Sequence, residues 1–110
     1  MRDQQKSGIL DVILRISDEE YQRDSWFGGG SCVSSPDELI NELFDDYGFV
    51  EYLNSSALTT AQRIIGRELL GKLEAFIAET PEVLDPAVTF SDGRWADIRH
   101  TARRLLDAIR

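Results

Sequence analysis

The fold is decided by residues 35–47, whose sequence is SPDELINELFDDY. Ser35 has a hydroxyl side chain of the kind preferred at a helix N-cap, and Pro36 suits the first helical position. Glu38 stands where a capping box needs its acidic residue, and carboxylates in this turn complement the helix dipole. Apolar and aromatic residues then recur every three or four positions up to Gly48, a residue suited to end a helix. The stretch therefore predicts a short amphipathic helix.

A second capping box predicts a long helix farther along the chain. Thr59 and Gln62 have the spacing of the box, and apolar residues recur at helical intervals as far as Glu79. Pro81 is expected to end this helix, because the residue before a proline avoids the helical region. The side chains expected on its apolar face are those of Ile65, Leu69, Leu73, Phe76 and Ile77, with Ile64 and Leu70 at the margin.

Helices are also expected near both ends of the chain. Residues 4–21 place apolar side chains on one helical face, and a final helix begins near Asp92 or Gly93. Residues 49–53 can add one short turn in the middle of the chain. The apolar residues of the two terminal helices are Ile9, Val12, Ile13 and Ile16, and then Trp95, Ile98, Ala102, Leu105, Leu106 and Ile109.

Glycine and proline mark the segments between these helices. Three consecutive glycines at residues 28–30 predict a loop, because glycine disfavours helix. Residues 81–93 are expected to be irregular around Pro86, with residues 88–90 briefly extended. We therefore predict an all-α protein, a single domain over residues 1–110 with four or five helices in a bundle-like arrangement.

The composition excludes several classes of protein. The chain has 110 residues with 12 Lys and Arg against 20 Asp and Glu, a formal charge of −8. This balance argues against a nucleic-acid partner, because binding to phosphates needs a basic surface. No run approaches the roughly 20 apolar residues that span a bilayer, so we expect no association with a membrane. A cytoplasmic location, with Cys32 reduced, is the natural interpretation.

The negative charge is concentrated in the middle of the chain. No Lys or Arg lies between Arg23 and Arg63, and this interval holds Asp24, Asp37, Glu38, Glu42, Asp45, Asp46 and Glu51. A block of one sign can steer an oppositely charged partner, although a solvated acidic face without a partner is the alternative. Nearby tyrosines offer contact area and a hydrogen bond, or half-buried packing. The predicted partner-binding residues are Asp37, Glu38, Glu42, Asp45, Asp46, Tyr47, Glu51 and Tyr52.

Catalytic and metal sites find little support in the sequence. Cys32 needs a neighbouring base to act as a nucleophile, and nothing places His100, the one histidine, beside it. The three carboxylates of Glu42, Asp45 and Asp46 allow a divalent-cation site or an acid–base pair, but they lack the spacing of a known metal motif. The glycine-rich loop lacks the Lys-Ser/Thr of a phosphate-binding loop. We therefore predict no catalytic residue, no metal and no cofactor.

Four short segments together resemble a family of small bacterial immunity proteins. They are a tryptophan followed by glycine in a loop, the sequence SSPDEL at residues 34–39, FDDY at residues 44–47 with Phe49 after it, and WADIR at residues 95–99 with Leu105 and Leu106. The family includes the immunity proteins of contact-dependent growth inhibition and related polymorphic-toxin systems. The resemblance spans roughly residues 20–110. It implies a non-catalytic protein that binds a cognate toxin domain, often a nuclease, and blocks its active site or substrate path.

The leading prediction is therefore an immunity protein that neutralises a basic toxin domain through an acidic surface. A small acidic adaptor or regulatory protein-binding module is the second hypothesis, and a carboxylate-dependent enzyme is the third. The oligomeric state is left open. The position of the gene directly after that of a large secreted toxin would favour the first hypothesis over the second. Saturable binding of a divalent metal would favour the third.

Overall fold

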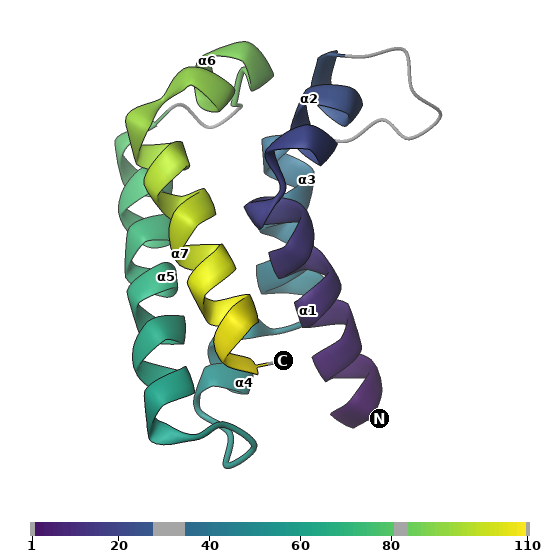
Figure 1. Cartoon of the computed structure of the whole chain (residues 1–110), viewed down its shortest axis with the longest axis vertical. Helices are drawn as coiled ribbons and strands as arrows, with labels where there is room; N and C mark the ends of the chain where they lie inside the picture. Colours follow the sequence, from purple (N-terminus) through teal and green to yellow (C-terminus); the bar gives the residue numbers. More distant parts are fainter. Residues whose placement is uncertain (1, 28–34, 81–83, 110) are drawn as a thin grey trace.

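In the computed structural model, residues 2–27, 35–80 and 84–109 are described, and their regular structure is entirely helical (Figure 1). The elements are α1 (Arg2–Ser17), α2 (Glu19–Phe27), α3 (Pro36–Asn41), the π-helical segment η1 (Glu42–Asp46), α4 (Phe49–Leu53), α5 (Thr60–Glu79), α6 (Pro86–Ser91) and α7 (Gly93–Ile109). The all-α prediction is confirmed. The expected number of four or five helices is too low, because the described residues form seven α-helices.

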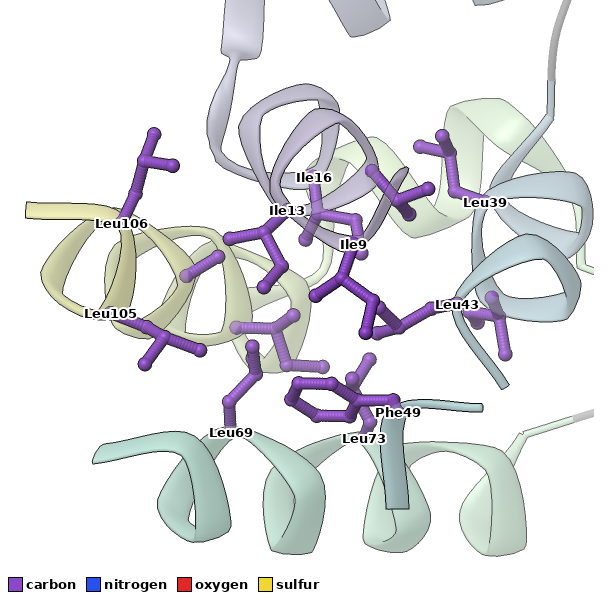
Figure 2. Close-up of a cluster of buried hydrophobic side chains, with 14 of the residues drawn as sticks. Ile9, Ile13, Ile16, Leu39, Leu43, Phe49, Leu69, Leu73, Leu105 and Leu106 are labelled. Carbon is purple, nitrogen blue, oxygen red and sulfur yellow. The ribbon is translucent and has the colours of Figure 1, made fainter. Parts of the chain in front are cut away.

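The long helices α1, α5 and α7 determine the arrangement of the molecule. Helix α7 packs against α5 on one side and against α1 on the other. Helix α3 and η1 pack against α1, and α4 connects η1 to the start of α5. In Figure 2 the helices α1, α3, α5 and α7 surround a shared interior. The fold is therefore bundle-like, with short helices at its ends.

The core contains the apolar stripes that the sequence predicts. Figure 2 shows these side chains gathered in the interior from α1, α3, η1, α5 and α7, with the Phe49 ring from α4 among them. The side chains that are almost completely buried include Ile9, Ile13, Ile16, Leu39, Leu43, Phe49, Leu69, Leu73, Leu105 and Leu106. Two of the predicted stripe residues on α5 differ, since Ile64 is 63% exposed and Ile77 is 44% exposed. At its C-terminal end, α5 therefore carries an apolar side chain on the surface.

Both predicted N-caps are present. The Ser35 hydroxyl accepts a hydrogen bond from the backbone N–H of Glu38, and Pro36 is the first residue of α3. Thr59 and Gln62 form the complete capping box at the start of α5, and the helix ends at Glu79 as expected. These bonds satisfy backbone donors that would otherwise lack a partner.

The single helix expected over residues 4–21 is in fact two helices. Asp18 separates them and accepts a hydrogen bond from the backbone N–H of Tyr21, which caps α2. Gln22 is completely buried, and its amide donates to the carbonyl oxygens of Arg15 and Ile16 at the end of α1. The buried Gln22 amide supplies hydrogen-bond donors for the last carbonyl oxygens of α1. The chain can therefore turn at this point without leaving these oxygens unsatisfied.

The segment expected to be irregular contains helix α6. Asp85 caps it by accepting hydrogen bonds from the backbone N–H groups of Ala87 and Val88, and Pro86 occupies the first position. The expectation that residues 88–90 are extended is therefore wrong. The same combination of cap and proline that begins α3 also begins α6.

An aromatic cluster connects α2, α6 and α7 at one end of the bundle. The Trp26 ring packs against Trp95 and Phe90, with ring centroids 5.9 and 6.3 Å away, and Phe76 from α5 lies against Trp95. The Trp95 indole donates a hydrogen bond to the buried Gln22 side chain at 3.0 Å. Edge and tilted contacts of this kind are favourable beyond the area that they bury.

None of the helices in the described part of the chain is long and apolar enough to cross a membrane.

Candidate partner-binding site

The site lies where η1 ends and α4 begins. The backbone N–H of Tyr47 donates to the carbonyl oxygen of Glu42, five residues earlier, at 3.0 Å, which is the hydrogen bond of a π-helix. Gly48 then adopts a left-handed conformation with φ of 61°, which glycine adopts without steric cost. The π-helical turn, followed by the change of chain direction at Gly48, leaves Asp45 and Asp46 exposed. We call this junction of η1 and α4 the corner. Figure 1 shows this part of the chain near the N-terminal end of α1.

Helix α1 holds this corner in place. The Gln5 amide donates to the carbonyl oxygen of Tyr47 at 3.0 Å, which satisfies an open carbonyl at the end of η1. The Tyr47 ring lies directly against the backbone of Gly8, where a Cβ atom would overlap it. The close approach therefore depends on a glycine in α1.

Four polar residues, two aromatic residues and one glycine form a pocket at the corner. It has a volume of about 600 Å³, and we call it the acidic pocket. Its lining consists of Gln5, Phe44, Asp45, Asp46, Tyr47, Gly48 and Glu51. The side chains of Asp45, Asp46 and Glu51 are exposed, and none of them forms an ion pair or a side-chain hydrogen bond with the residues that the structure describes. The pocket therefore brings together three carboxylates whose charge the described structure leaves uncompensated.

Glu42 differs from these three carboxylates because it has a basic partner. The Arg15 guanidinium donates to both oxygens of the Glu42 carboxylate and also pairs with Asp11 at 3.0 Å. Partial burial disfavours the charged guanidinium. The hydrogen bonds to Glu42 and Tyr21 and the charge of Asp11 outweigh this effect and raise the pKa of Arg15. Arg15 of α1 therefore neutralises part of the negative charge that the sequence concentrates between Arg23 and Arg63.

The structure separates the other predicted partner-binding residues. Asp37 accepts a hydrogen bond from the backbone N–H of Leu84 at 3.0 Å. Its carboxylate therefore connects α3 to the chain just before α6. Glu38 is exposed and does not line the acidic pocket, whereas the half-buried Tyr47 does. Tyr52 is only 5% exposed, and burial raises the pKa of its hydroxyl. Tyr52 belongs to the core, so its inclusion in an exposed binding surface is corrected here.

Three residues that line the pocket are not among the predicted partner-binding residues, and one of them, Gly48, is predicted only as the end of a helix. Phe44 was assigned to the apolar stripe of its helix, yet its ring is only half-buried and lines the pocket. Gln5 carries no pattern in the sequence that marks it, because its role depends on the packing of α1 against η1. The one signal in the sequence was the position of Phe44 at the edge of the apolar stripe of a short helix.

The surroundings of the carboxylates bear on the metal and acid–base hypotheses. Within the described ranges, no three His, Cys, Asp or Glu side chains are placed to hold a metal ion. A carboxylic acid that acts in catalysis is usually buried, whereas Asp45, Asp46 and Glu51 are exposed. His100 is exposed on α7, and Cys32 and the glycines at 28–30 lie outside the described residues. The arrangement is suited to attracting positive charge.

A second charged region lies between α5 and α7, and we call it the α5–α7 seam. Lys72 donates to Glu68, Asp97 and the buried Thr101 hydroxyl at 2.8–3.1 Å. Arg104 also donates to Glu68, at 2.7 Å. Hydrogen bonds from Lys72 and Arg104 lower the pKa of Glu68. Each carboxylate of the seam therefore has a basic partner.

Comparison with known proteins adds no relative: no family model matches the sequence, and neither a curated protein nor a solved structure matches it.

Proposed function

We propose that this protein is a non-catalytic binding protein that neutralises a basic toxin domain, as an immunity protein does, and that the acidic pocket is its binding site. The observation that carries the proposal is the group of three exposed carboxylates, those of Asp45, Asp46 and Glu51, around one pocket. The resemblance of the sequence to immunity proteins of polymorphic-toxin systems supports the choice of partner. The expected site of action is the cytoplasm, where such a toxin domain would reach its target.

The electrostatics of the pocket support a partner of opposite charge. Like charges held close together repel one another, and this repulsion is relieved when a cation approaches. A basic groove, such as that of a nuclease active site, would be attracted over a distance of about 8 Å at physiological salt. Occupation of that groove by the acidic corner would block the path of the toxin's own substrate. The proposal therefore needs no reaction on this chain.

The experiment begins with the product of the gene immediately upstream. The C-terminal domain of that product is expressed in bacteria with and without this protein, and growth and complex formation are measured. Protection of the cells together with a stable complex supports the proposal. A domain that is not toxic, or one that this chain neither binds nor neutralises, overturns it. Binding without protection would identify an adaptor instead.

The site is tested by charge reversal with a matched control. The variant Asp45→Lys/Asp46→Lys changes the charge of the acidic pocket, and Glu20→Lys/Asp24→Lys makes the same change in exposed residues of α2. We expect association with the basic domain at low salt to slow about tenfold or more for the first variant only. Equal effects of the two variants would assign the attraction to the overall charge rather than to the pocket.

A further inference from the structure

An apolar groove lies beside the acidic pocket. Two surface hollows, with volumes of about 350 and 370 Å³, share Ile77 of α5 and Phe44 of η1. Phe44 also lines the acidic pocket, so its ring connects the three hollows. The residues of the apolar groove are Asp37, Ile40, Asn41, Phe44, Glu74, Ile77, Ala78, Thr80 and Leu84.

The groove lies between α3 and α5, two helices that pack chiefly against other elements. Helix α3 packs against α1, η1 packs against both α1 and α4, and α5 packs mainly against α7. Figure 2 shows α3 and α5 on adjacent sides of the core, with Leu39 of α3 and Leu43 of η1 directed inward, and with Leu69 and Leu73 directed inward from α5. Ile77 lies one helical turn beyond Leu73 and is 44% exposed. Its apolar surface is therefore available to another molecule.

The charges around the groove all have the same sign. Glu74 is exposed at its edge, Asp37 lies at its other side, and the acidic pocket continues from Phe44. None of the described residues that line the three hollows is Lys, Arg or His. An occupant that covers the apolar surface would therefore meet carboxylates on both sides. Electrostatic complementarity requires basic residues at the flanks of its apolar face.

We infer that the apolar groove binds an amphipathic helix of the protein partner, one whose apolar stripe is flanked by Lys and Arg. This inference rests on the proposed function and specifies the recognised segment of the toxin domain. The described part of the chain has no strand to which a partner strand could add, so apolar recognition here is of the helix-in-groove type. Glu74, Ile77 and Ala78 follow the spacing of three and four that a packed helix presents.

The first test uses a synthetic peptide as the probe. A helical peptide of about 18 residues, or five turns, carries a leucine stripe flanked by lysines. Its controls are a peptide of the same composition without the stripe and a peptide with glutamate in place of lysine. Binding is followed by changes in the amide NMR spectrum. We expect saturable changes centred on Phe44, Ile77 and Leu84 with the first peptide only. Equal binding of all three peptides, or of none, overturns the inference.

A matched pair of variants tests the groove itself. Ile77→Ser removes the exposed side chain in the groove, and Ile64→Ser removes a more exposed isoleucine on the same helix outside it. We expect Ile77→Ser to weaken binding of the lysine-flanked peptide about tenfold and Ile64→Ser to leave it unchanged. Thermal unfolding of both variants provides the check on folding. Sedimentation of the protein alone that shows self-association sensitive to Ile77→Ser would identify a second copy as the occupant and overturn the inference.

The two proposals fail in different ways. If the toxin domain binds and Asp45→Lys/Asp46→Lys weakens the complex but Ile77→Ser does not, the groove inference fails and the proposed function stands. If the lysine-flanked peptide binds at Ile77 but the domain encoded upstream is neither bound nor neutralised, the immunity function fails and the groove inference stands.

Discussion

The α5–α7 seam and the acidic pocket are two charged regions with opposite organisation. In the seam, Lys72 and Arg104 each donate to carboxylates, and Lys72 also bonds the buried Thr101 hydroxyl. In the pocket, Asp45 and Asp46 are exposed and have no basic partner among the residues that the structure describes. The charges of the seam are satisfied within the molecule. The charges of the pocket are not used to hold the described fold together.

This difference indicates where binding can be changed without loss of stability. Exposed carboxylates that make no contacts contribute little to folding, so their replacement is expected to change the free energy of unfolding by no more than about 0.5 kcal/mol. Paired carboxylates of the seam and of the Arg15–Glu42 pair are expected to behave differently. Glu42 lies close to the pocket in sequence but belongs with the paired group. The following predictions test this division, beginning with the largest effect.

The contact that holds the pocket against α1 is expected to give the largest effect. Gly8→Ala places a methyl group against the Tyr47 ring, and such overpacking costs about 1–3 kcal/mol of unfolding free energy. Gly71→Ala is the control, because nothing lies within 4 Å of the added Cβ atom. The control is expected to stabilise α5 by about 0.5–1 kcal/mol. Urea unfolding measures both values. Equal stability of the two variants would show that Tyr47 does not depend on Gly8.

Removal of the Glu42 charge is expected to have the next largest effect. Glu42→Gln leaves the half-buried Arg15 guanidinium without its main partner, at a cost of about 1–2 kcal/mol. Asp45→Asn should change the unfolding free energy by less than about 0.5 kcal/mol. A double-mutant cycle with Arg15→Met isolates the coupling between Arg15 and Glu42. A coupling free energy near zero would show that the pair with Arg15 adds no stability and that Glu42 behaves like the unpaired acids.

The two lysines of the chain offer a comparison of moderate size. Lys72→Met loses the bonds to Glu68, Asp97 and Thr101, and we expect a cost of about 0.5–1 kcal/mol. Lys6 is exposed and has no partner among the described residues, so Lys6→Met should be close to neutral. The midpoints of thermal unfolding distinguish the two variants. Similar midpoints would mean that the seam contributes no net stability.

The pH dependence of Glu68 is expected to give the smallest effect. Because hydrogen bonds from Lys72 and Arg104 lower its pKa, the ionised form stabilises the folded state. This contribution is complete above the unfolded pKa of about 4.5 and is lost as the pH falls through the lower folded pKa. The difference in Tm between wild type and Glu68→Gln should therefore narrow as the pH falls below about 4.5. A difference that stays constant down to pH 3, or one that persists in a Lys72→Met/Arg104→Met background, would contradict this assignment.

Local signals in the sequence predicted much of the fold. The caps at Ser35 and Thr59 and the turn at Gly48 depend on neighbouring residues only, and all three are present. The signal at Asp85-Pro86 is of the same kind and begins α6. The prediction instead takes Pro86 as a mark of irregular structure, and the β-branched Val88 and Thr89 favour extended structure. Here tertiary packing against α2 and α7 overrides the intrinsic preference.

The candidate site was less predictable because it depends on contacts between distant residues. Arg15 and Glu42 are 27 positions apart, so the sequence gives no indication that they pair. The π-helical turn of η1 ends with the hydrogen bond from Tyr47 to the carbonyl oxygen of Glu42, and no residue pattern marks this turn. Tyr52 follows the acidic stretch but faces the interior, since α4 packs this side against α5. Charge in the sequence marks the acidic region, and packing determines which of its side chains remain exposed.

The aromatic cluster has a practical consequence for experiments on this protein. Both tryptophans of the chain, Trp26 and Trp95, lie in the contact between α2, α6 and α7, and neither lines the acidic pocket or the apolar groove. Intrinsic fluorescence will therefore report the separation of these three helices during unfolding. A partner that docks rigidly at the pocket would leave the emission spectrum almost unchanged. A change in emission upon binding would instead reveal a rearrangement transmitted through the bundle.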